Sequence, residues 1–187
     1  MKRRQFLALS LLNPMLSFSD SRVKTGLVLD DKFLHHQISP AHPEKPARYQ
    51  AIKQQLQDSD LINKTLSIHP IENAEQWLTL VHSKQHIAKI KQQVEIHKNA
   101  VLATAGVLAA VDAVCRGIVT NAFCASRPPG HHAMNTGQEE GFCYYNHIAI
   151  AARYAQQHYN LKKVLIIDWD YHHGNGTEWA FYSDPSV

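Results

Sequence analysis

The sequence contains few cysteines and no long apolar run. Cys115, Cys124 and Cys143 are an odd number without CxxC spacing, which favours buried free thiols over a disulfide framework or a thiolate metal site. No apolar run approaches the roughly 18 residues that a membrane-spanning helix requires, so we expect no membrane span. With 187 residues, 44% of them hydrophobic and 19% charged, the chain has the composition of one globular domain.

The chain also lacks an excess of positive charge outside its first residues. The net charge of +3 comes from residues 2–4, because the 16 basic residues beyond Ser19 are balanced by 16 acidic residues. Such a neutral body lacks the basic surface with which nucleic-acid binders contact phosphates. We therefore expect no direct binding to nucleic acid, and the sequence leaves the oligomeric state open.

The N-terminal segment has the layout of an export signal. Basic residues 2–4 precede a short apolar stretch, residues 6–12, and then a serine-containing end. The sequence RRQFL resembles the twin-arginine export motif. We therefore expect residues 1–22 to direct export to the periplasm. The alternative is a disordered N-terminus of a cytoplasmic protein.

Apolar periodicity predicts alternating strands and helices along the remainder, residues 23–187. The segment KKVLIID, residues 162–168, is apolar on both faces and too short for a helix, which is typical of a central parallel strand. This alternation indicates a single α/β domain with an open parallel sheet flanked by helices. Further strands are predicted at 25–30 and 121–126, and helices after 48, at 83–97, at 100–116 with a stop at Gly117, and from a cap at Asn146 to about Tyr159.

Acidic and imidazole side chains follow that last strand in DWDYHHGNG, residues 168–176. Along an extended chain, Asp168, Asp170 and His172 project to one side. Open α/β sheets place ligand sites at the carboxyl ends of their strands, and an Asp-x-His pair suits zinc or a similar divalent ion. Two aspartates on one face repel unless a cation or strong donors compensate, so a purely structural role is the weaker alternative.

A second histidine cluster, RPPGHHA at residues 127–133, also follows a predicted strand. We therefore expect His131 and His132 at the same edge of the sheet. Histidine is the usual general acid or base near neutral pH, and two of them could divide the roles. The spacing alone leaves open whether they bind the metal or move protons.

Five ordered blocks of the sequence resemble the histone deacetylase superfamily, which includes acetylpolyamine amidohydrolases and acetoin-utilisation proteins. The resemblance implies an arginase/deacetylase-like fold and hydrolysis of acetylated lysine or acetylated polyamines. Asn175 and the first block are more similar to the class II branch than to class I. The blocks are HPEKPAR, VHSKQHI, RPPGHHA, GFCYYN and DWDYHHGNGTEWAFY.

The resemblance also implies a role for each matching residue. The implied zinc ligands are Asp170 and His172. The implied catalytic group beside the metal-bound water is His131, His132, Asp168 and Asn175. The implied wall of the acyl-lysine tunnel is Gly141 and Phe142. The main-chain oxygens implied for two potassium sites are those of Asp168, Asp170 and His172, and those of Phe181, Asp184 and Val187.

The family's third zinc-binding aspartate and its catalytic tyrosine lie downstream of the Asp-x-His strand, beyond Val187. The resemblance therefore implies a sheet that is incomplete at the C-terminus and a chain that is inactive alone. One alternative is a non-catalytic remnant that acts as a binding module. A two-manganese hydrolase of the arginase type is disfavoured, because Gly174 stands where that DxHxD pattern has an acid.

Overall fold

The computed structural model describes residues 24–187, which contain a three-stranded parallel sheet. Strands β1 (Thr25–Val28), β2 (Leu66–Ile68) and β3 (Asn121–Cys124) lie in the order β2-β1-β3. Gly26 of the central strand β1 lies opposite Leu66 on one side and Ala122 on the other. The α/β fold with a parallel sheet is thus confirmed. The predicted export signal, residues 1–22, lies outside the described residues.

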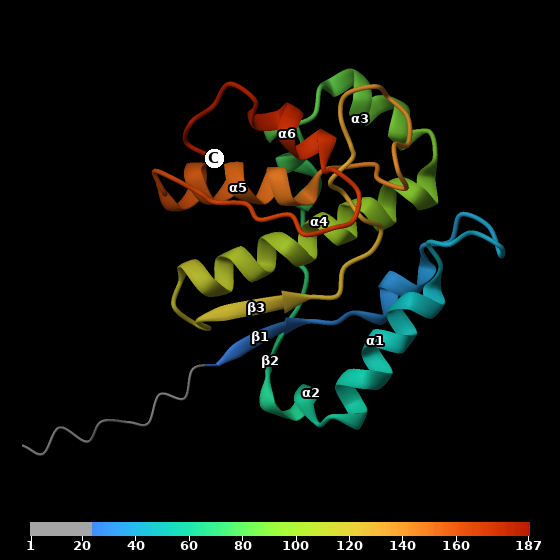
Figure 1. Cartoon of the computed structure of the whole chain (residues 1–187), viewed down its shortest axis with the longest axis vertical. Coiled ribbons are helices and arrows are strands. Elements are labelled where there is room, and N and C mark those ends of the chain that lie inside the picture. Colours follow the sequence, from blue (N-terminus) through green and yellow to red (C-terminus); the bar gives the residue numbers. More distant parts are fainter. Residues whose placement is uncertain (1–23) are drawn as a thin grey trace, which may run out of the picture.

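Helices cover both faces of this sheet. Figure 1 shows α1 and α2 on one side of the sheet, whereas α4 and then α5 lie on the other side. The helices are α1 (Pro46–Asp58), α2 (Leu61–Lys64), α3 (Lys84–Lys91), α4 (Val94–Cys115), α5 (His147–Tyr159) and α6 (Asn175–Phe181), with 3₁₀ segments η1 (Asp31–His35) and η2 (Ala74–Leu80).

Helix α4 lies at the centre of the fold, between the sheet and α5. Half of its buried residues are alanines, and its glycine, Gly106, comes so close to the sheet that a Cβ there would lie 2.9 Å from Cγ1 of Val28. Small side chains let the helix and the strands approach each other closely. Leu108 of α4 is fully buried in the core that α4 shares with α5.

Helix α4 is long and apolar enough, by length and composition alone, to cross a membrane. The expectation of no membrane span stays a prediction. Most of its apolar window is buried inside the described structure, as in the core helix of a folded domain.

Several local predictions are confirmed. The strands predicted at 25–30 and 121–126 are present as β1 and β3, and α4 ends before Gly117, which has φ of +68°. The Oδ1 atom of Asn146 accepts a hydrogen bond of 3.1 Å from the main-chain N–H of Ala149, so Asn146 caps α5 as predicted.

The continuous helix predicted at 83–97 is wrong. Helix α3 ends at Lys91, and α4 begins at Val94. Ile87 and Ile90 are buried, but the side chain of Val94 is exposed, so the three residues do not share one buried face. The chain changes direction at Gln92 and Gln93, which the apolar spacing alone did not indicate.

The strand predicted at 162–168 is also wrong, because these residues are not assigned to a strand. Val164 and Ile166 pack against an apolar cluster of α5 and α6, whereas Leu165 is 82% exposed and Ile167 is 71% exposed. The main-chain N–H of Val164 donates to the carbonyl of Ser186 at 2.9 Å, not to a neighbouring strand. Apolar composition on both faces does not make a strand unless a second backbone pairs with it.

Candidate active site

Two histidine-containing segments meet beside α6. The loop between β3 and α5, residues 125–146, presents His131 and His132. The segment before α6 presents Asp168, and the first residue of α6 is Asn175. Nδ1 of His131 lies 2.9 Å from Oδ2 of Asp168, and Nδ1 of His132 lies 2.6 Å from Oδ1 of Asn175. The structure thus brings together the four residues predicted to form the catalytic group.

These contacts decide where each imidazole carries its proton. A carboxylate oxygen and an amide oxygen can only accept, so Nδ1 must be the donor in both His131 and His132. The Nε2 atom of each neutral ring then lacks a proton and can accept one. The two rings lie side by side, with centroids 4.1 Å apart. The arrangement is a His-Asp dyad next to a His-Asn dyad.

Asp168 is held in its charged form. Burial alone would raise its pKa, but the hydrogen bond from His131 and another from the main-chain N–H of Asp170 outweigh that effect and lower the pKa below its usual value.

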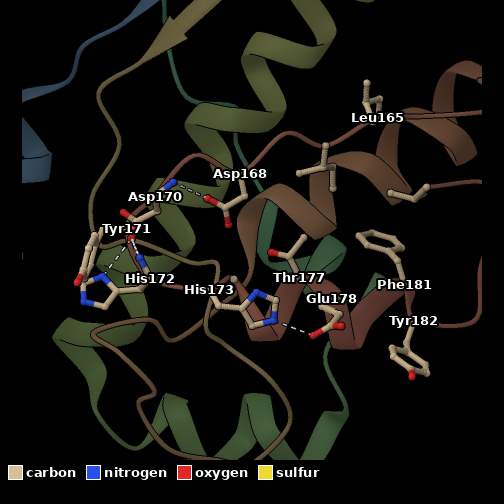
Figure 2. A pocket seen from close by; sticks show the side chains of 13 residues that line it. Leu165, Asp168, Asp170, Tyr171, His172, His173, Thr177, Glu178, Phe181 and Tyr182 are labelled. Atoms are coloured by element: carbon tan, nitrogen blue, oxygen red, sulfur yellow. Dashed lines mark hydrogen bonds and ion pairs between the residues drawn. The ribbon is translucent and has the colours of Figure 1, made fainter.

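Asp170 and His172 lie next to each other on the segment that leads to α6, as Figure 2 shows. Oδ1 of Asp170 is 3.1 Å from Nδ1 of His172 and accepts a hydrogen bond of 2.7 Å from its main-chain N–H. That main-chain hydrogen bond is the first cause of the lowered pKa of Asp170. The side chains are 50% and 70% exposed, so both can reach an ion from solvent.

The donor set of this pair fits zinc. Two ligands of one tetrahedral zinc, each about 2.0 Å from the metal, lie roughly 3.3 Å apart, close to the Asp170–His172 separation. The ring of His132 is 6.0 Å from that of His172. Within residues 24–187, no third His, Cys, Asp or Glu joins Asp170 and His172 in a metal-binding group.

Gly176 permits the close contact between the two segments. A Cβ at Gly176 would lie 2.6 Å from the carbonyl oxygen of Ala133 and 2.7 Å from that of His132. The main-chain N–H of Thr177 also donates to the carbonyl of His131 at 3.0 Å. Helix α6 therefore packs directly on the main chain of the tandem histidines.

Phe142, predicted to form a tunnel wall, follows Gly141, and both residues have positive φ, +69° and +53°. The ring of Phe142 packs edge-on against His42 with centroids 4.4 Å apart. A Cβ at Gly141 would collide with the ring of His132, so this turn lies directly against the histidine.

A cavity of about 830 Å³ is lined in part by Asp170 and His172. Phe142, Gly141 and the tandem histidines are not among its lining residues, all of which belong to the last 23 residues of the chain, 165–187. Figure 2 shows His173 at this cavity pointing toward Glu178, and the two side chains are 2.8 Å apart. The cavity is thus distinct from the predicted acyl-lysine tunnel.

The main-chain oxygens predicted to bind potassium lie on the same segment. Those of Phe181 and Asp184 accept hydrogen bonds from the N–H groups of Asp184 and Val187, at 2.8 and 3.4 Å, in the turns that follow α6. The side chain of Asp184 pairs with Arg153, and hydrogen bonds from Ser186, together with that pairing, lower the pKa of Asp184 to about 2. The two potassium sites stay predictions.

Sequence reasoning missed a buried ion pair at the start of the histidine loop. Nε and Nη2 of Arg127 donate to the two carboxylate oxygens of Glu44 at 2.8 and 2.7 Å, and Nη1 donates to the carbonyl of Phe33 at 2.6 Å. Glu44 and Arg127 are 2% and 4% exposed. Glu44 in the block HPEKPAR and Arg127 in the block RPPGHHA were the available signal.

Comparisons with known proteins identify similar sequences. The family model described as histone deacetylase domain matches residues 42–187. Histone deacetylase 9 of Homo sapiens is 32% identical over 87% of this chain, and polyamine deacetylase HDAC10 of Mus musculus is 38% identical over 77% of it. Polyamine deacetylase HDAC10 of Danio rerio is 32% identical over 87%. The chain spans 20 to 28% of the length of these relatives.

Proposed function

Since this chain belongs to the histone deacetylase family, we propose that it acts in the metal-dependent removal of acetyl groups from acetylated lysine or acetylated polyamines. The observation that carries the proposal is the pair of imidazole dyads beside Asp170 and His172. Two similar proteins are named polyamine deacetylases, which supports an acetylated amine as substrate. Hydrolysis of such an amide gives acetate and a free amine.

Asp170 and His172 would hold the metal ion, which we propose to be Zn²⁺. Bound zinc lowers the pKa of a coordinated water and polarises a carbonyl oxygen, which is the chemistry that amide hydrolysis requires. The main-chain hydrogen bond from His172 keeps the carboxylate of Asp170 charged and oriented toward the imidazole of His172.

We assign the proton-transferring role to His132. Its ring is 6.0 Å from that of His172, and its Nε2 atom is free to accept a proton because Nδ1 donates to Asn175. The protonated ring can then return that proton to the nitrogen of the leaving amine. His131, paired with the carboxylate of Asp168, is better suited to carry a positive charge throughout and to stabilise developing negative charge.

Gly141 and Phe142 would line the path of the acyl group to this site. This proposal is supported by the turn at these two residues, whose positive φ angles bring the main chain at Gly141 against the ring of His132. The proposed ligands of K⁺ are the main-chain oxygens of two sets of residues: Asp168, Asp170 and His172, and Phe181, Asp184 and Val187.

The test is acetate release by the protein purified from the cells that naturally produce it. N-acetylputrescine and an acetyl-lysine peptide would be compared with and without a zinc chelator. We expect turnover that the chelator removes and added zinc restores. Residues 1–187 expressed by themselves are expected to be inactive, because their described part offers two protein ligands for the ion.

A binding module is the second candidate function, and the same two-ligand donor set favours it. It predicts that neither the native protein nor the expressed chain releases acetate, while an acetylated amine still binds. Calorimetric titration with N-acetylputrescine separates the two candidates, since only the enzyme converts the ligand during the experiment.

We also propose export through the twin-arginine route, supported by the RRQFL sequence. The double variant Arg3→Lys and Arg4→Lys should accumulate in the cytoplasmic fraction, whereas the unchanged protein should be found in the periplasm. Cytoplasmic location of the unchanged protein would contradict this proposal.

A further inference from the structure

Two buried histidines outside the proposed site contact the loop that carries the tandem histidines. His82, between η2 and α3, is 2% exposed, and His86, in α3, is 1% exposed. Their rings are stacked, with centroids 4.7 Å apart and planes at 21°. The proposed chemistry uses neither of them.

His82 uses both ring nitrogens on the main chain of the loop. Nδ1 lies 3.0 Å from the carbonyl oxygen of Met134, and Nε2 lies 2.8 Å from the main-chain nitrogen of Asn146. Since a carbonyl can only accept and a main-chain N–H can only donate, Nδ1 carries the proton and Nε2 does not.

His86 uses its two nitrogens in the opposite sense. Nε2 lies 2.8 Å from the carbonyl oxygen of Tyr144, and Nδ1 lies 2.9 Å from the main-chain nitrogen of Gly137. Here Nε2 must be the donor and Nδ1 the acceptor. Each ring can make both of its hydrogen bonds only as a neutral imidazole, because an imidazolium has no acceptor.

The four main-chain contacts lie on the C-terminal side of the tandem histidines and on both sides of Gly141 and Phe142. Those at Met134 and Gly137 follow His131 and His132, and those at Tyr144 and Asn146 follow Phe142. A side chain of the loop also contacts the segment that carries the two buried histidines: Oδ1 of Asn135 accepts a hydrogen bond of 2.8 Å from the main-chain N–H of Ser83. Fixing these points leaves the tandem histidines little freedom to move away from Asp168 and Asn175.

We infer that His82 and His86 are positioning residues, which hold the tandem histidines and Phe142 in place as neutral imidazoles of opposite tautomers. Their relevance to catalysis rests on the proposed deacetylase function. Their effect on the loop does not, because the four hydrogen bonds are made without metal or substrate.

The surroundings favour the neutral state. Burial is the main cause of the lowered pKa of both rings, and the pKa of His82 is lowered to about 4 by burial and by the neighbouring His86, against the opposing effects of Asn135 and Met134. Glu140 on the loop has the opposite effect on His86. Tyr145 packs against both rings, and His97 of α4 lies beyond it, with its Nδ1 2.8 Å from the Tyr145 hydroxyl.

The direct test is nuclear magnetic resonance of the full chain with ¹⁵N-labelled histidine. Nitrogen shifts and two-bond couplings distinguish the tautomers of neutral imidazole. We expect an Nδ1–H tautomer for His82, an Nε2–H tautomer for His86, and neutral rings at pH 6. The same tautomer in both rings, or a charged ring at pH 6, would overturn the inference.

Variants test the positioning role. His86→Phe keeps a ring of similar shape but removes both hydrogen bonds, and amide exchange at Gly137 should become roughly tenfold faster or more. His82→Phe should do the same at Asn146. His69→Phe, at an exposed position after β2, is the surface control and should leave both amides unchanged.

A control of matched stability separates positioning from general loss of structure. Leu108→Ala should destabilise the core that α4 shares with α5 while leaving the four hydrogen bonds of His82 and His86 in place. The ring signals of His131 and His132 should shift in His86→Phe and stay in place in Leu108→Ala. Equal shifts in both variants would mean that His86 stabilises the fold in general and does not specifically position the tandem histidines. If the Phe variants do not fold, the tautomer measurement on the unchanged chain still tests whether His82 and His86 are neutral rings of opposite tautomers.

Discussion

The substitution Gly176→Ala tests whether α6 packs on the main chain of the tandem histidines. Gly176 is in α6 and does not have positive φ, so its own backbone accommodates alanine. In a helix without neighbours, glycine to alanine stabilises by about 1 kcal/mol. The sign of the measured change therefore reports the packing.

The packing predicts destabilisation. The new methyl group would lie 2.6 Å from both the carbonyl oxygen of Ala133 and the carbonyl carbon of His132, which are main-chain atoms that cannot rotate away. Overpacking of this kind costs typically about 1–3 kcal/mol. We expect a loss of unfolding free energy of about that size, together with longer His131–Asp168 and His132–Asn175 contacts.

Guanidinium unfolding, followed by tryptophan fluorescence, measures the stability, and the ring signals of His131 and His132 measure the site. Gly117→Ala is the control, since a Cβ there has no neighbour within 4 Å but φ is +68°. It should lose about 1 kcal/mol without changing the histidine signals. If Gly176→Ala is as stable as the unchanged chain or more stable, the close contact described here does not exist.

Three further predictions concern stability. The pKa values of His36 and His82 are each lowered to about 4, mainly by burial, so between pH 6.5 and 4 the unfolded chain binds protons that the folded chain does not. The free energy of unfolding should therefore fall over this range by up to roughly 3 kcal/mol per histidine. Urea unfolding at pH 7.5, 5.5 and 4.5 checks this, and a constant midpoint would refute it. Glu44→Gln leaves Arg127 buried without its counter-charge and should cost about 3–5 kcal/mol in thermal or chemical unfolding, whereas a loss below 1 kcal/mol would show that the pair is solvated. Asn146→Ala removes the cap of α5 and should cost about 1 kcal/mol, measured in the same way; no change would mean that another group caps the helix.

Local signals in the sequence predicted the elements that depend on local chemistry. Each of these elements depends on a few consecutive residues. Strands β1 and β3 and the Asn146 cap of α5 are examples, and all three are present. The meeting of His131 with Asp168 could also be expected, because both were predicted to follow strands that end at the same edge of a sheet. That expectation was met although the second strand does not form.

Features that depend on distant partners could not be predicted. Residues 162–168 have the composition of a strand, but strand formation needs a second backbone, which their own side chains do not specify. His82 and His86 contact residues 51 to 64 positions away, and no spacing within VHSKQHI indicates those contacts. The exposed Leu165 and Ile167 show the same limit, since composition predicts apolar faces but not which face is covered.

The division of roles between Asp170–His172 and His131–His132 is tested most directly by measuring bound zinc and acetate release together. The protein as its own cells make it would be compared with His172→Ala and His132→Ala. We predict that His172→Ala loses zinc and activity, whereas His132→Ala keeps zinc and releases acetate roughly two to four orders of magnitude more slowly. Equal loss of zinc in both variants, or full activity in His132→Ala, would contradict the account.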